Sequence, residues 1–600
     1  MRSMRLILLF VVAPLWLQPV PVARAAWLPD GNPICRVPET LRGVVGVAHF
    51  RCNFGCEASL GLFWADGRSA VGTSIYAGGL SDLGSPPDGP GDVPATLIRD
   101  VPWGCTPLAA VSVPVLDHTT QFTPGATVLV WTESPPGSFG TLRARRLYEP
   151  ADWGADGVLI ASNVYQVSAS AVPDDSGGVI IAWASSGPQG TRDYVQRIDA
   201  NGSLRWGTGG ILLGPDTTNH LRPHIAADGA GGLYVLRAAR DSSIALPIQL
   251  YVNALYHFGR DGQPVAGWPA EGRRDIPMLA PHGINADLFG AELRADLSGC
   301  WVVGFGPSGR QVTRLLPGGG YAPGWTGAGA PVVTGQSGEI EFQDASIGAS
   351  GDLLLLLLRT QVGIGGGLVA GSEDLLAQRI PKAGGISPGW GAAGVEVCTA
   401  PGRQAEGRAL ARGDGLFCAW SDQRSDAGDI YAVRLSADGT RPAEWPANGF
   451  LLCGATGAQS APLLAGNFVG GGLVAWLDQR QFATYQTDLY GTSISGDAQI
   501  GLAVGDAAPR EFALSSVRPN PARSAAHVNL ELPIAAELRL EVFDVAGRLV
   551  HQQREHVAAG RPTIEWNLRD DAGTKVRPGL YLMQVSAGVF RGRARVLVAD

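Results

Sequence analysis

Tryptophan recurs along this chain in one fixed local pattern. Each of seven tryptophans is followed four residues later by glycine, and eight residues later by a small or apolar residue. Between Trp153 and Trp445 the copies follow one another at a mean distance of about 58 residues. A repeat of this length indicates one supersecondary unit used many times, in a stack or a ring. The tryptophans are Trp27, Trp153, Trp206, Trp268, Trp325, Trp390 and Trp445.

A second unit alternates with the first. It is a short apolar segment, often opened by two glycines and closed by tryptophan, as at residues 177–183 and 471–476, and eight copies are present. Further strand-like segments and Asn-Gly or Asp-Gly turns follow, so each period holds about four strands joined by tight hairpins. Four-stranded units repeated in this number predict an all-β fold, a seven- or eight-bladed β-propeller over residues 26–497. A count of seven blades remains an alternative to eight, because residues 80–125 are irregular in sequence.

The first unit also predicts how the blades pack and how the ring closes. Tryptophan would fill the wedge between neighbouring blades, and glycine would allow close approach of the backbone. The copy at Trp27 belongs to the second half of a blade, whereas the strands around residues 473–494 lack a second half. We therefore expect the two ends of the propeller to complete one blade, which hides two sheet edges.

Three of the apolar segments continue as Trp-x-Asp-x-Arg. One interpretation is a ring of charged groups around a pore or ligand. The other is an Asp–Arg pair that caps the strand and fixes the next turn. We favour the cap, because identical spacing in separate repeats indicates shared scaffold rather than one active site. The pairs are Asp66 and Arg68, Asp422 and Arg424, and Asp478 and Arg480.

The start of the chain predicts export. Arg2 and Arg5 precede an apolar run, and Ala23-Arg24-Ala25 fits a cleavage site, so residues 1–25 are expected to be a signal peptide. The mature chain contains no further segment long enough to span a bilayer. Eight cysteines are present, and their pairing cannot be deduced from sequence. The net charge of −8, without a basic cluster, argues against nucleic acid as a partner.

The sequence pattern changes after residue 497, where the tryptophan repeat ends. Residues 498–515 are predicted to be a linker, and residues 516–600 hold six or seven alternating strands, which favours an Ig-like β-sandwich. Asp544 and Gly547 would set a hairpin turn, Trp566 would anchor the core and Tyr581 would be a corner tyrosine. None of these residues is expected to be catalytic.

The same segment resembles a known family. Its motifs are similar to the FlgD-like Ig-like domain and to the type A sorting domain of the type IX secretion system. The resemblance implies a β-sandwich that serves sorting or surface attachment, with the secretion machinery as a partner. The propeller region is similar to uncharacterised repeats that precede such domains in secreted bacterial proteins. The motif residues are Asn520, Asp544, Gly547, Arg548, Trp566, Gly573, Gly579 and Tyr581.

Candidate sites for chemistry are few. His220 and His224 have the spacing of a helical metal pair, but their flanks predict loop and strand. The turns at residues 174–178 and 228–232 offer carboxylates to calcium, although a plain hairpin turn is the favoured interpretation. No cofactor and no catalytic residue is predicted, and the G-x-S-x-G and H-E-x-x-H motifs are absent from the sequence.

These patterns favour a non-enzymatic protein of the cell surface or the extracellular space, with the periplasm as a further destination. The propeller would present a binding or structural surface to a protein or glycan that the sequence does not identify. The C-terminal sandwich would serve export or attachment. The alternative is a secreted polysaccharide hydrolase or lyase with its site in the propeller mouth.

Overall fold

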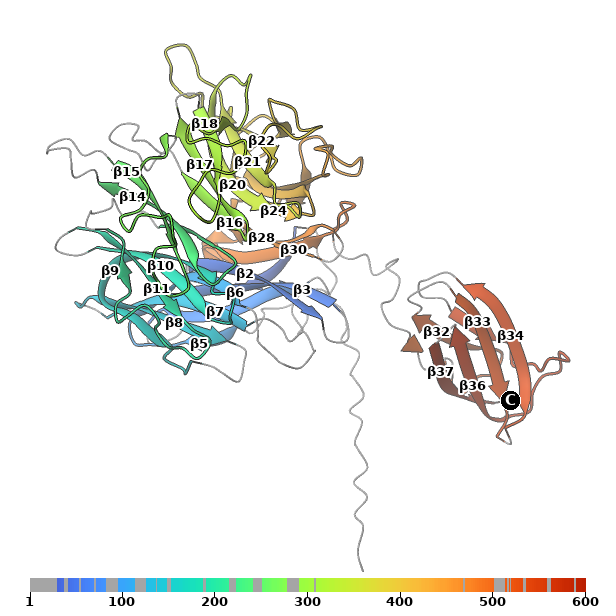
Figure 1. Cartoon of the computed structure of the whole chain (residues 1–600). Helices are drawn as coiled ribbons and strands as arrows, with labels where there is room; N and C mark the ends of the chain where they lie inside the picture. The colour runs from blue at the N-terminus through green and yellow to red at the C-terminus, as the bar shows by residue number, and fades with distance from the viewer. Residues whose placement is uncertain are drawn as a thin grey trace, which may run out of the picture.

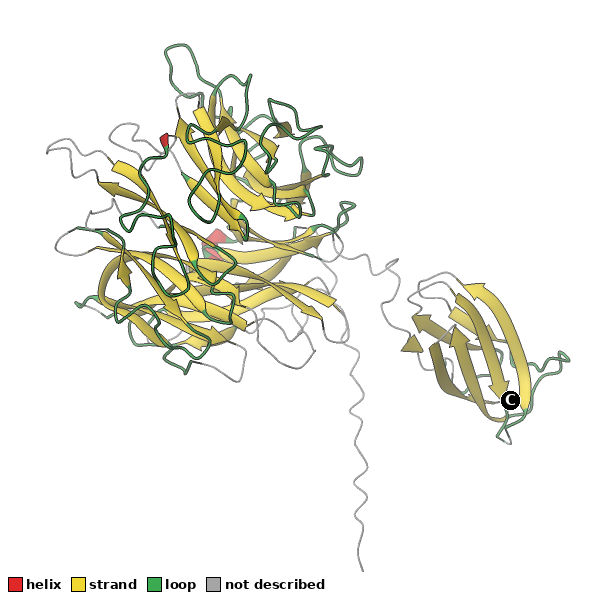
Figure 2. Ribbon diagram, in the orientation of Figure 1, coloured by secondary structure: helices red, strands yellow, loops and turns green. Residues whose placement is uncertain are grey.

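The chain is described by a computed structural model (Figures 1 and 2). Strands dominate throughout (Figure 2). Among the described residues there is one α-helix, α1 (Phe482–Tyr485). The all-β prediction is therefore confirmed. The described residues are 30–500 and 513–599, with gaps at 37–40, 53–55, 69–71, 82–94, 114–125, 136, 148–152, 187–189, 215–222, 241–250, 278–290, 307–308, 468–469, 515–516, 518–519, 532–535, 546, 558–562 and 588–589.

The first thirty strands form antiparallel blades, numbered here along the chain. Blade 1 contains β2 (Arg42–Cys52), β3 (Cys56–Asp66), β4 (Ser74–Ser81) and β5 (Thr96–Arg99). Blade 2 contains β6 (Gly104–Val113), β7 (Ala126–Ser134), β8 (Gly140–Leu147) and the first part of β9 (Val158–Pro173). Blade 3 contains the rest of β9, β10 (Val179–Ser186), β11 (Arg192–Ile198) and β12 (Ile211–Leu212). Blade 4 contains β13 (His224–Ala227), β14 (Leu233–Arg240) and β15 (Tyr251–Phe258).

Four more blades follow. Blade 5 contains β16 (Glu292–Asp296), β17 (Gly299–Gly306), β18 (Gly309–Leu315) and β19 (Ala330–Pro331). Blade 6 contains β20 (Glu339–Ile347), β21 (Leu353–Thr360), β22 (Asp374–Ile380) and β23 (Val395–Cys398). Blade 7 contains β24 (Gln404–Arg412), β25 (Gly415–Asp422), β26 (Asp429–Leu435) and β27 (Phe450–Cys453). Blade 8 contains β28 (Gln459–Gly466), β29 (Gly472–Asp478), β30 (Asp488–Ile494) and, from the other end of the propeller, β1 (Asn32–Cys35).

The ring is closed by its own two ends. Strand β1 pairs antiparallel with β30, with Asn32 opposite Gly491, and so completes blade 8. The innermost strands contact one another in cyclic order, β2, β6, β9, β13, β16, β20, β24, β28 and again β2. The described residues thus form an eight-bladed β-propeller, the larger of the two predicted sizes. Strand β9 serves two blades without a break, which is why blades 2 and 3 form one seven-stranded sheet.

The second strand of each blade carries the apolar core. All residues of β25 are buried, as are Leu353 to Leu358 of β21. Both faces of such a strand meet a neighbouring blade, so the sequence is continuously apolar instead of alternating. Each fully buried leucine contributes about 1.5–3 kcal/mol to the free energy of folding, and this term drives association of the blades.

The repeated tryptophans connect one blade to the next. In each described copy the indole Nε1 donates a hydrogen bond to a backbone carbonyl in the turn between the third strand and the outer segment of the following blade. Trp27 lies outside the described residues. The pairs are Trp153 and Ala200 (3.1 Å), Trp206 and Arg260 (3.1 Å), Trp268 and Pro317 (2.8 Å), Trp325 and Lys382 (2.7 Å), Trp390 and Ala437 (2.9 Å), and Trp445 and Gly496 (2.9 Å).

The glycine of the same unit is required by close packing. A Cβ on Gly449 would lie 2.4 Å from the ring of Trp420, and one on Gly31 would lie 2.4 Å from the ring of Trp476. Both glycines also have positive φ, +87° and +81°, which other residues rarely adopt. Each glycine therefore lets the outer segment of a blade lie directly on the tryptophan that closes the second strand of that blade.

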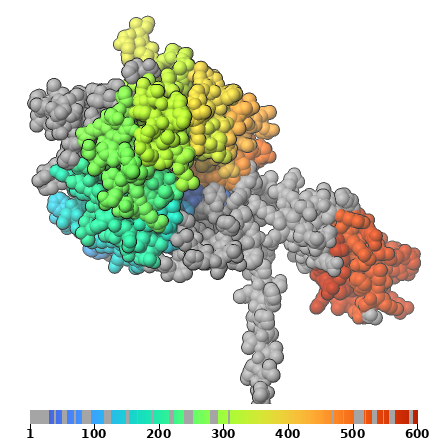
Figure 3. All heavy atoms as spheres, viewed as in Figure 1, coloured from blue at the N-terminus to red at the C-terminus, as the bar shows by residue number. Residues whose placement is uncertain are grey.

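The remaining strands form a β-sandwich with a core of its own. One sheet contains β31 (Ala513–Leu514), β32 (Ala526–Glu531) and β35 (Thr563–Trp566). The other contains β34 (Leu549–Val557), β33 (Ala536–Phe543), β36 (Gly579–Ala587) and β37 (Phe590–Val598). Val528, Leu540 and Trp566 are buried between the two sheets. In Figure 3 the atoms of the C-terminal residues, coloured red, form a body apart from the propeller.

We predict that Trp445→Ala lowers the free energy of unfolding by about 3–5 kcal/mol, because it removes a buried aromatic ring and leaves a cavity. Trp445 is 3% exposed and packs edge-on against Phe417 at a centroid distance of 6.0 Å. Phe482→Ala is the control, since Phe482 is 57% exposed and its loss should cost less than about 0.5 kcal/mol. Urea unfolding of both variants measures the difference. Equal urea midpoints for the two variants would show that the ring of Trp445 does not stabilise the propeller.

Candidate functional site

The Trp-x-Asp-x-Arg string of blade 7 is folded around a buried carboxylate. The indole Nε1 of Trp420 donates to Oδ2 of Asp422 at 2.9 Å. The backbone N and the Nε of Arg424 both donate to Oδ1, at 3.0 and 2.9 Å. Asp422 has no exposed surface, so its charge is stable only because these donors replace water. The carboxylate caps the end of β25 and fixes the turn that follows.

Blades 1 and 8 repeat this arrangement. In each, the tryptophan donates to the aspartate at 2.9 Å, and the arginine closes a salt bridge of 2.6 Å with the same carboxylate. The residues are Trp64, Asp66 and Arg68 in blade 1, and Trp476, Asp478 and Arg480 in blade 8.

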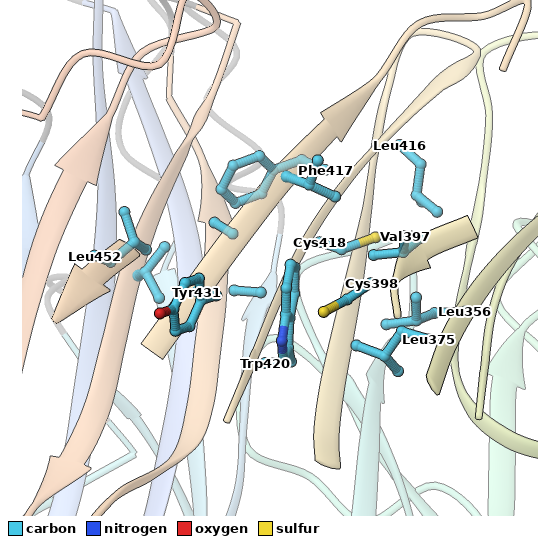
Figure 4. Close-up of a cluster of buried hydrophobic side chains, with 14 of the residues drawn as sticks. Leu356, Leu375, Val397, Cys398, Leu416, Phe417, Cys418, Trp420, Tyr431 and Leu452 are labelled. Carbon is cyan, nitrogen blue, oxygen red and sulfur yellow. The ribbon is translucent and has the colours of Figure 1, made fainter. Parts of the chain in front are cut away.

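Each arginine also covers a tyrosine and reaches a cysteine of the preceding blade. The guanidinium of Arg424 lies 3.9 Å from the ring centroid of Tyr431, and its Nη2 lies 3.0 Å from Sγ of Cys398 in the outer strand of blade 6. Figure 4 shows Tyr431 and Cys398 with Trp420 between them. We call the group of aspartate, arginine, tyrosine and cysteine a plug. The other two plugs place Arg68 over Tyr76 (4.2 Å) beside Cys35, and Arg480 over Tyr490 (3.9 Å) beside Cys453.

The cysteines of the plugs are protonated thiols. Burial raises the pKa of Cys398 to about 11 and the pKa values of Cys35 and Cys453 to about 12. A nucleophilic cysteine needs the opposite shift, toward the thiolate. The plugs therefore connect blades and do not provide a reactive sulfur. They lie at the ends of the second and third strands, and not on the innermost strands of the blades.

Sequence analysis singled out the aspartates and arginines of the plugs but missed the cysteines and tyrosines. A signal for the cysteines was present. The copies of the tryptophan unit that end in cysteine, at Cys35, Cys398 and Cys453, each precede one Trp-x-Asp-x-Arg string. The contact itself crosses from one blade to the next, so it could be recognised only after the blades were placed side by side.

The inner strands of the blades have a polar arrangement of their own. Inner strands of neighbouring blades do not pair, so their edges would leave backbone N–H groups without partners. Side chains of the preceding blade satisfy several of them. Asp344 accepts from the backbone N of Ala409 at 3.0 Å, and Glu406 accepts from the backbone N of Ala461 at 2.6 Å. These polar residues are thus part of the scaffold.

A row of unlike charges crosses three of the inner strands. His224 on β13 lies 3.2 Å from Glu292 on β16, and Arg294 on β16 bridges Glu292 at 2.8 Å and Asp344 on β20 at 2.9 Å. Burial alone would raise the pKa of Glu292, but the hydrogen bond and charge of His224, with the charge of Arg294, lower it to about 2. Glu292 is therefore ionised at any physiological pH. His220 lies outside the described residues.

The two turns considered for calcium are stabilised by protein donors. Asp174 accepts from the backbone N of Gly178 at 2.7 Å and forms a 2.8 Å salt bridge with Arg197. Asp228 accepts from the backbone N of Gly232 at 2.8 Å and lies 3.1 Å from His257. Within the part of the chain that the structure describes, no three His, Cys, Asp or Glu side chains gather as a metal site. Calcium stays an untested alternative to the favoured interpretation of plain hairpin turns.

The predicted motif residues of the sandwich hold its turns and its core. Asp544 accepts from the backbone N and Nε of Arg548, at 3.0 and 2.8 Å, across the turn at Gly547. Gly547 and Gly573 have φ of +75° and +80°, and Gly579 begins β36.

Asn520 and Tyr581 hold the rest of the sandwich together. The amide of Asn520 accepts from the backbone N of Leu597 at 2.8 Å, which attaches the start of the domain to β37. Tyr581 donates to the carbonyl of Arg577 at 2.8 Å and packs against Trp566 at a centroid distance of 5.3 Å.

Comparison with protein families identifies the C-terminal segment. Residues 516–598 match the family described as the secretion system C-terminal sorting domain. A domain of this kind directs type IX secretion and implies contact with that machinery. The chain is therefore an exported protein that reaches the outer surface. Among the described residues there is no helix of the length and apolarity needed to cross a membrane.

No curated protein matches the chain. Among solved structures, PorZ, a bacterial surface component of the type-IX secretion system of Porphyromonas gingivalis, is 11% identical over 92% of this chain and 87% of its own, with a TM-score of 0.21. An arabinanase of Penicillium chrysogenum is 11% identical over 59% and 98%, with a TM-score of 0.30. An endo-arabinase of Bacteroides thetaiotaomicron is 14% identical over 46% and 94%, with a TM-score of 0.24. Similarity at this level says nothing about activity.

We predict that Asp429→Asn stabilises the propeller at neutral pH. Burial, with the nearby charge of Asp426, raises the pKa of Asp429 from 3.8 to about 6. The folded state therefore binds more protons than the unfolded state between these values, and its stability falls as the pH rises from about 4 to about 6. Asparagine removes this loss. The gain at pH 7 should be about 1 kcal/mol, less than the full shift would give, because the buried asparagine amide also carries a cost of desolvation.

Urea unfolding of the wild type and the variant at pH 4 and pH 7 provides the measurement. The difference in stability should be near zero at pH 4 and positive at pH 7. Glu444→Gln, which removes an exposed carboxylate from the same blade, is the matched control. A difference that does not change with pH would contradict the burial of a costly charge at Asp429.

Proposed function

We propose that this protein is a non-enzymatic component of the outer surface, in which the propeller binds a ligand and the sandwich is recognised by the secretion machinery. The match of residues 516–598 to the sorting family is the observation that carries the proposal. Within that proposal, the domain is of type A, and its likeness to the FlgD-like Ig-like domain belongs to the same hypothesis. Residues 26–497 would be the exported cargo.

The scaffold supports binding by a rigid surface. The indole hydrogen bonds join successive blades on one rim, and the plugs join blades 6, 7, 8 and 1 on the other. A platform held in this way can present side chains in fixed positions, which reduces the entropy lost when a ligand binds.

Hydrolysis of a polysaccharide in the channel is the second candidate. The row of His224, Glu292, Arg294 and Asp344 is the feature that favours it. Glycoside hydrolysis uses two carboxyl groups, one of which must hold a proton to protonate the leaving group. Glu292 cannot do so, because its neighbours keep it ionised. The row suits the bracing of inner strands better than acid catalysis.

We predict that deletion of residues 516–600 keeps the propeller folded but prevents its appearance on the surface. The sandwich has a separate core, so its removal exposes little of the propeller core. The measurement is protease accessibility of the propeller on intact cells of a host with type IX secretion, and Val545→Ala at an 80% exposed position is the control. Equal surface amounts of the truncated and full-length proteins would contradict the proposal.

We also predict that the purified full-length protein releases no reducing ends from a panel of polysaccharides. Any activity that is found should be compared with that of Glu292→Gln. Turnover that disappears in Glu292→Gln, with unchanged melting temperature, would replace the binding role by hydrolysis in the channel.

A further inference from the structure

Blade 3 contains a cavity at the position where blades 1, 7 and 8 carry plugs. The cavity has a volume of about 510 Å³ and lies where β9 passes from blade 2 to blade 3. Its lining includes Trp183, Tyr194, Arg192, Ser185 and Asn163. This volume lies within the range of about 300–1,000 Å³ that is usual for small-molecule sites.

Strand register shows that the cavity and the plug are equivalent places. In blade 7, Trp420 lies opposite Tyr431, and two positions further along β25 Asp422 lies opposite Asp429. In blade 3, Trp183 lies opposite Tyr194, and two positions further Ser185 lies opposite Arg192. The aromatic pair is retained, since Trp183 and Tyr194 stack at a centroid distance of 5.4 Å.

The residues that fill the plug are replaced in blade 3. Ser185 stands in place of the central aspartate, and in the sequence Gly187 stands in place of the arginine. Ala161 stands in place of the cysteine that ends the tryptophan unit of the preceding blade. All three changes shorten or remove a side chain. The cavity therefore lies at the place where the aspartate and the cysteine lie in blades 1, 7 and 8.

The charge at this place is also reversed. Blade 7 has two aspartates and one arginine in the equivalent positions, whereas blade 3 has a single arginine, Arg192, and no carboxylate among them. A cationic ligand would be repelled. An anionic group beside Arg192 would be favoured, because ionic hydrogen bonds to a guanidinium are among the strongest that proteins make.

The rest of the lining consists of neutral hydroxyl and amide groups. Ser162, Asn163, Ser185 and Ser186 line the cavity together with the aromatic pair. Asn163 is exposed and has a φ of +57°, and it lies where the register between β8 and β9 shifts. Such a bulge turns a side chain out of the regular alternation of the strand. Several neutral groups in different directions match the hydroxyls of a sugar better than a single phosphate.

Resting on the proposed role of the propeller in binding, we infer that this cavity is a binding site for an acidic saccharide. A sugar ring would pack its C–H face on Tyr194, in the place where an arginine covers the tyrosine of each plug. Its carboxylate would pair with Arg192, and its hydroxyls would bond to the serines and Asn163. The ligand class is a polysaccharide that contains uronic acids.

Titration calorimetry of the full-length protein with tetragalacturonate tests this site, with maltotetraose as the neutral comparison. Tetragalacturonate should bind, and maltotetraose should bind at least about tenfold more weakly, because it lacks the ionic hydrogen bond. Arg192→Ala should weaken tetragalacturonate binding by about tenfold or more. Arg205→Ala removes a half-exposed arginine of the same blade and should leave the affinity unchanged.

A second variant is designed to fill the cavity, whereas Arg192→Ala only removes the charged group that would bind the ligand. Ser185→Asp combined with Gly187→Arg recreates the Trp-x-Asp-x-Arg string in blade 3 and should abolish binding without lowering the melting temperature. Equal affinities of Arg192→Ala and Arg205→Ala, or binding retained by the refilled variant, would overturn the site while leaving a binding role for the propeller elsewhere. Failure of the wild type to bind tetragalacturonate would overturn the ligand class. Failure to bind any member of a glycan and protein panel would overturn the proposed function as well.

Discussion

The indole hydrogen bond from each blade to the next is the interaction on which the propeller depends. A four-stranded sheet that is apolar on both faces is insoluble alone, so every blade needs two neighbours. Dispersion forces and the burial of apolar surface bring the blades together, but they do not fix the orientation of one blade relative to the next. A tryptophan that donates to one carbonyl of the following turn sets both the distance and the angle between blades. Because the same angle is repeated from one blade to the next, the ring closes and the two ends of the propeller meet.

The plugs lie where the ring is not covalently continuous. Blade 8 is made from both ends of the propeller, and blades 7 and 1 lie on either side of it. The three plugs belong to these three blades. Arg480 also donates to the carbonyl of Asp30 at 2.7 Å, and the backbone N of Gly454 donates to its carboxylate at 2.9 Å. Charge-assisted contacts thus hold the place where the first residues of the propeller join the last.

Sequence predicted the fold well because its signals are local. The tryptophan and glycine spacing, the apolar second strands and the incomplete units at the two ends were sufficient for a propeller of seven or eight blades. The count stayed open because residues 80–125, which contain β5 and β6, are irregular in sequence. Strand β9 also runs through two blades without a turn. No composition signal marks a strand that changes blade.

The candidate sites were harder to predict, for a physical reason. An Asp–Arg pair two residues apart is visible in the sequence, but its tyrosine and cysteine partners come from another strand and another blade. The row from His224 to Asp344 combines three strands that are far apart in the chain. The cavity of blade 3 lies at the position that a plug fills in blade 7. Only strand register shows that the two positions are equivalent.

The buried thiols have a consequence for how an exported chain matures. Six of the eight cysteines, Cys35, Cys105, Cys300, Cys398, Cys418 and Cys453, are free and buried. Burial raises the pKa of the three plug thiols, Cys35, Cys398 and Cys453. Oxidants act on accessible thiolates, so these six thiols are protected in an oxidising compartment once the propeller has folded. The unfolded chain has no such protection. Folding must therefore be faster than oxidation, and a molecule denatured in air would regain its native form only with a reductant present.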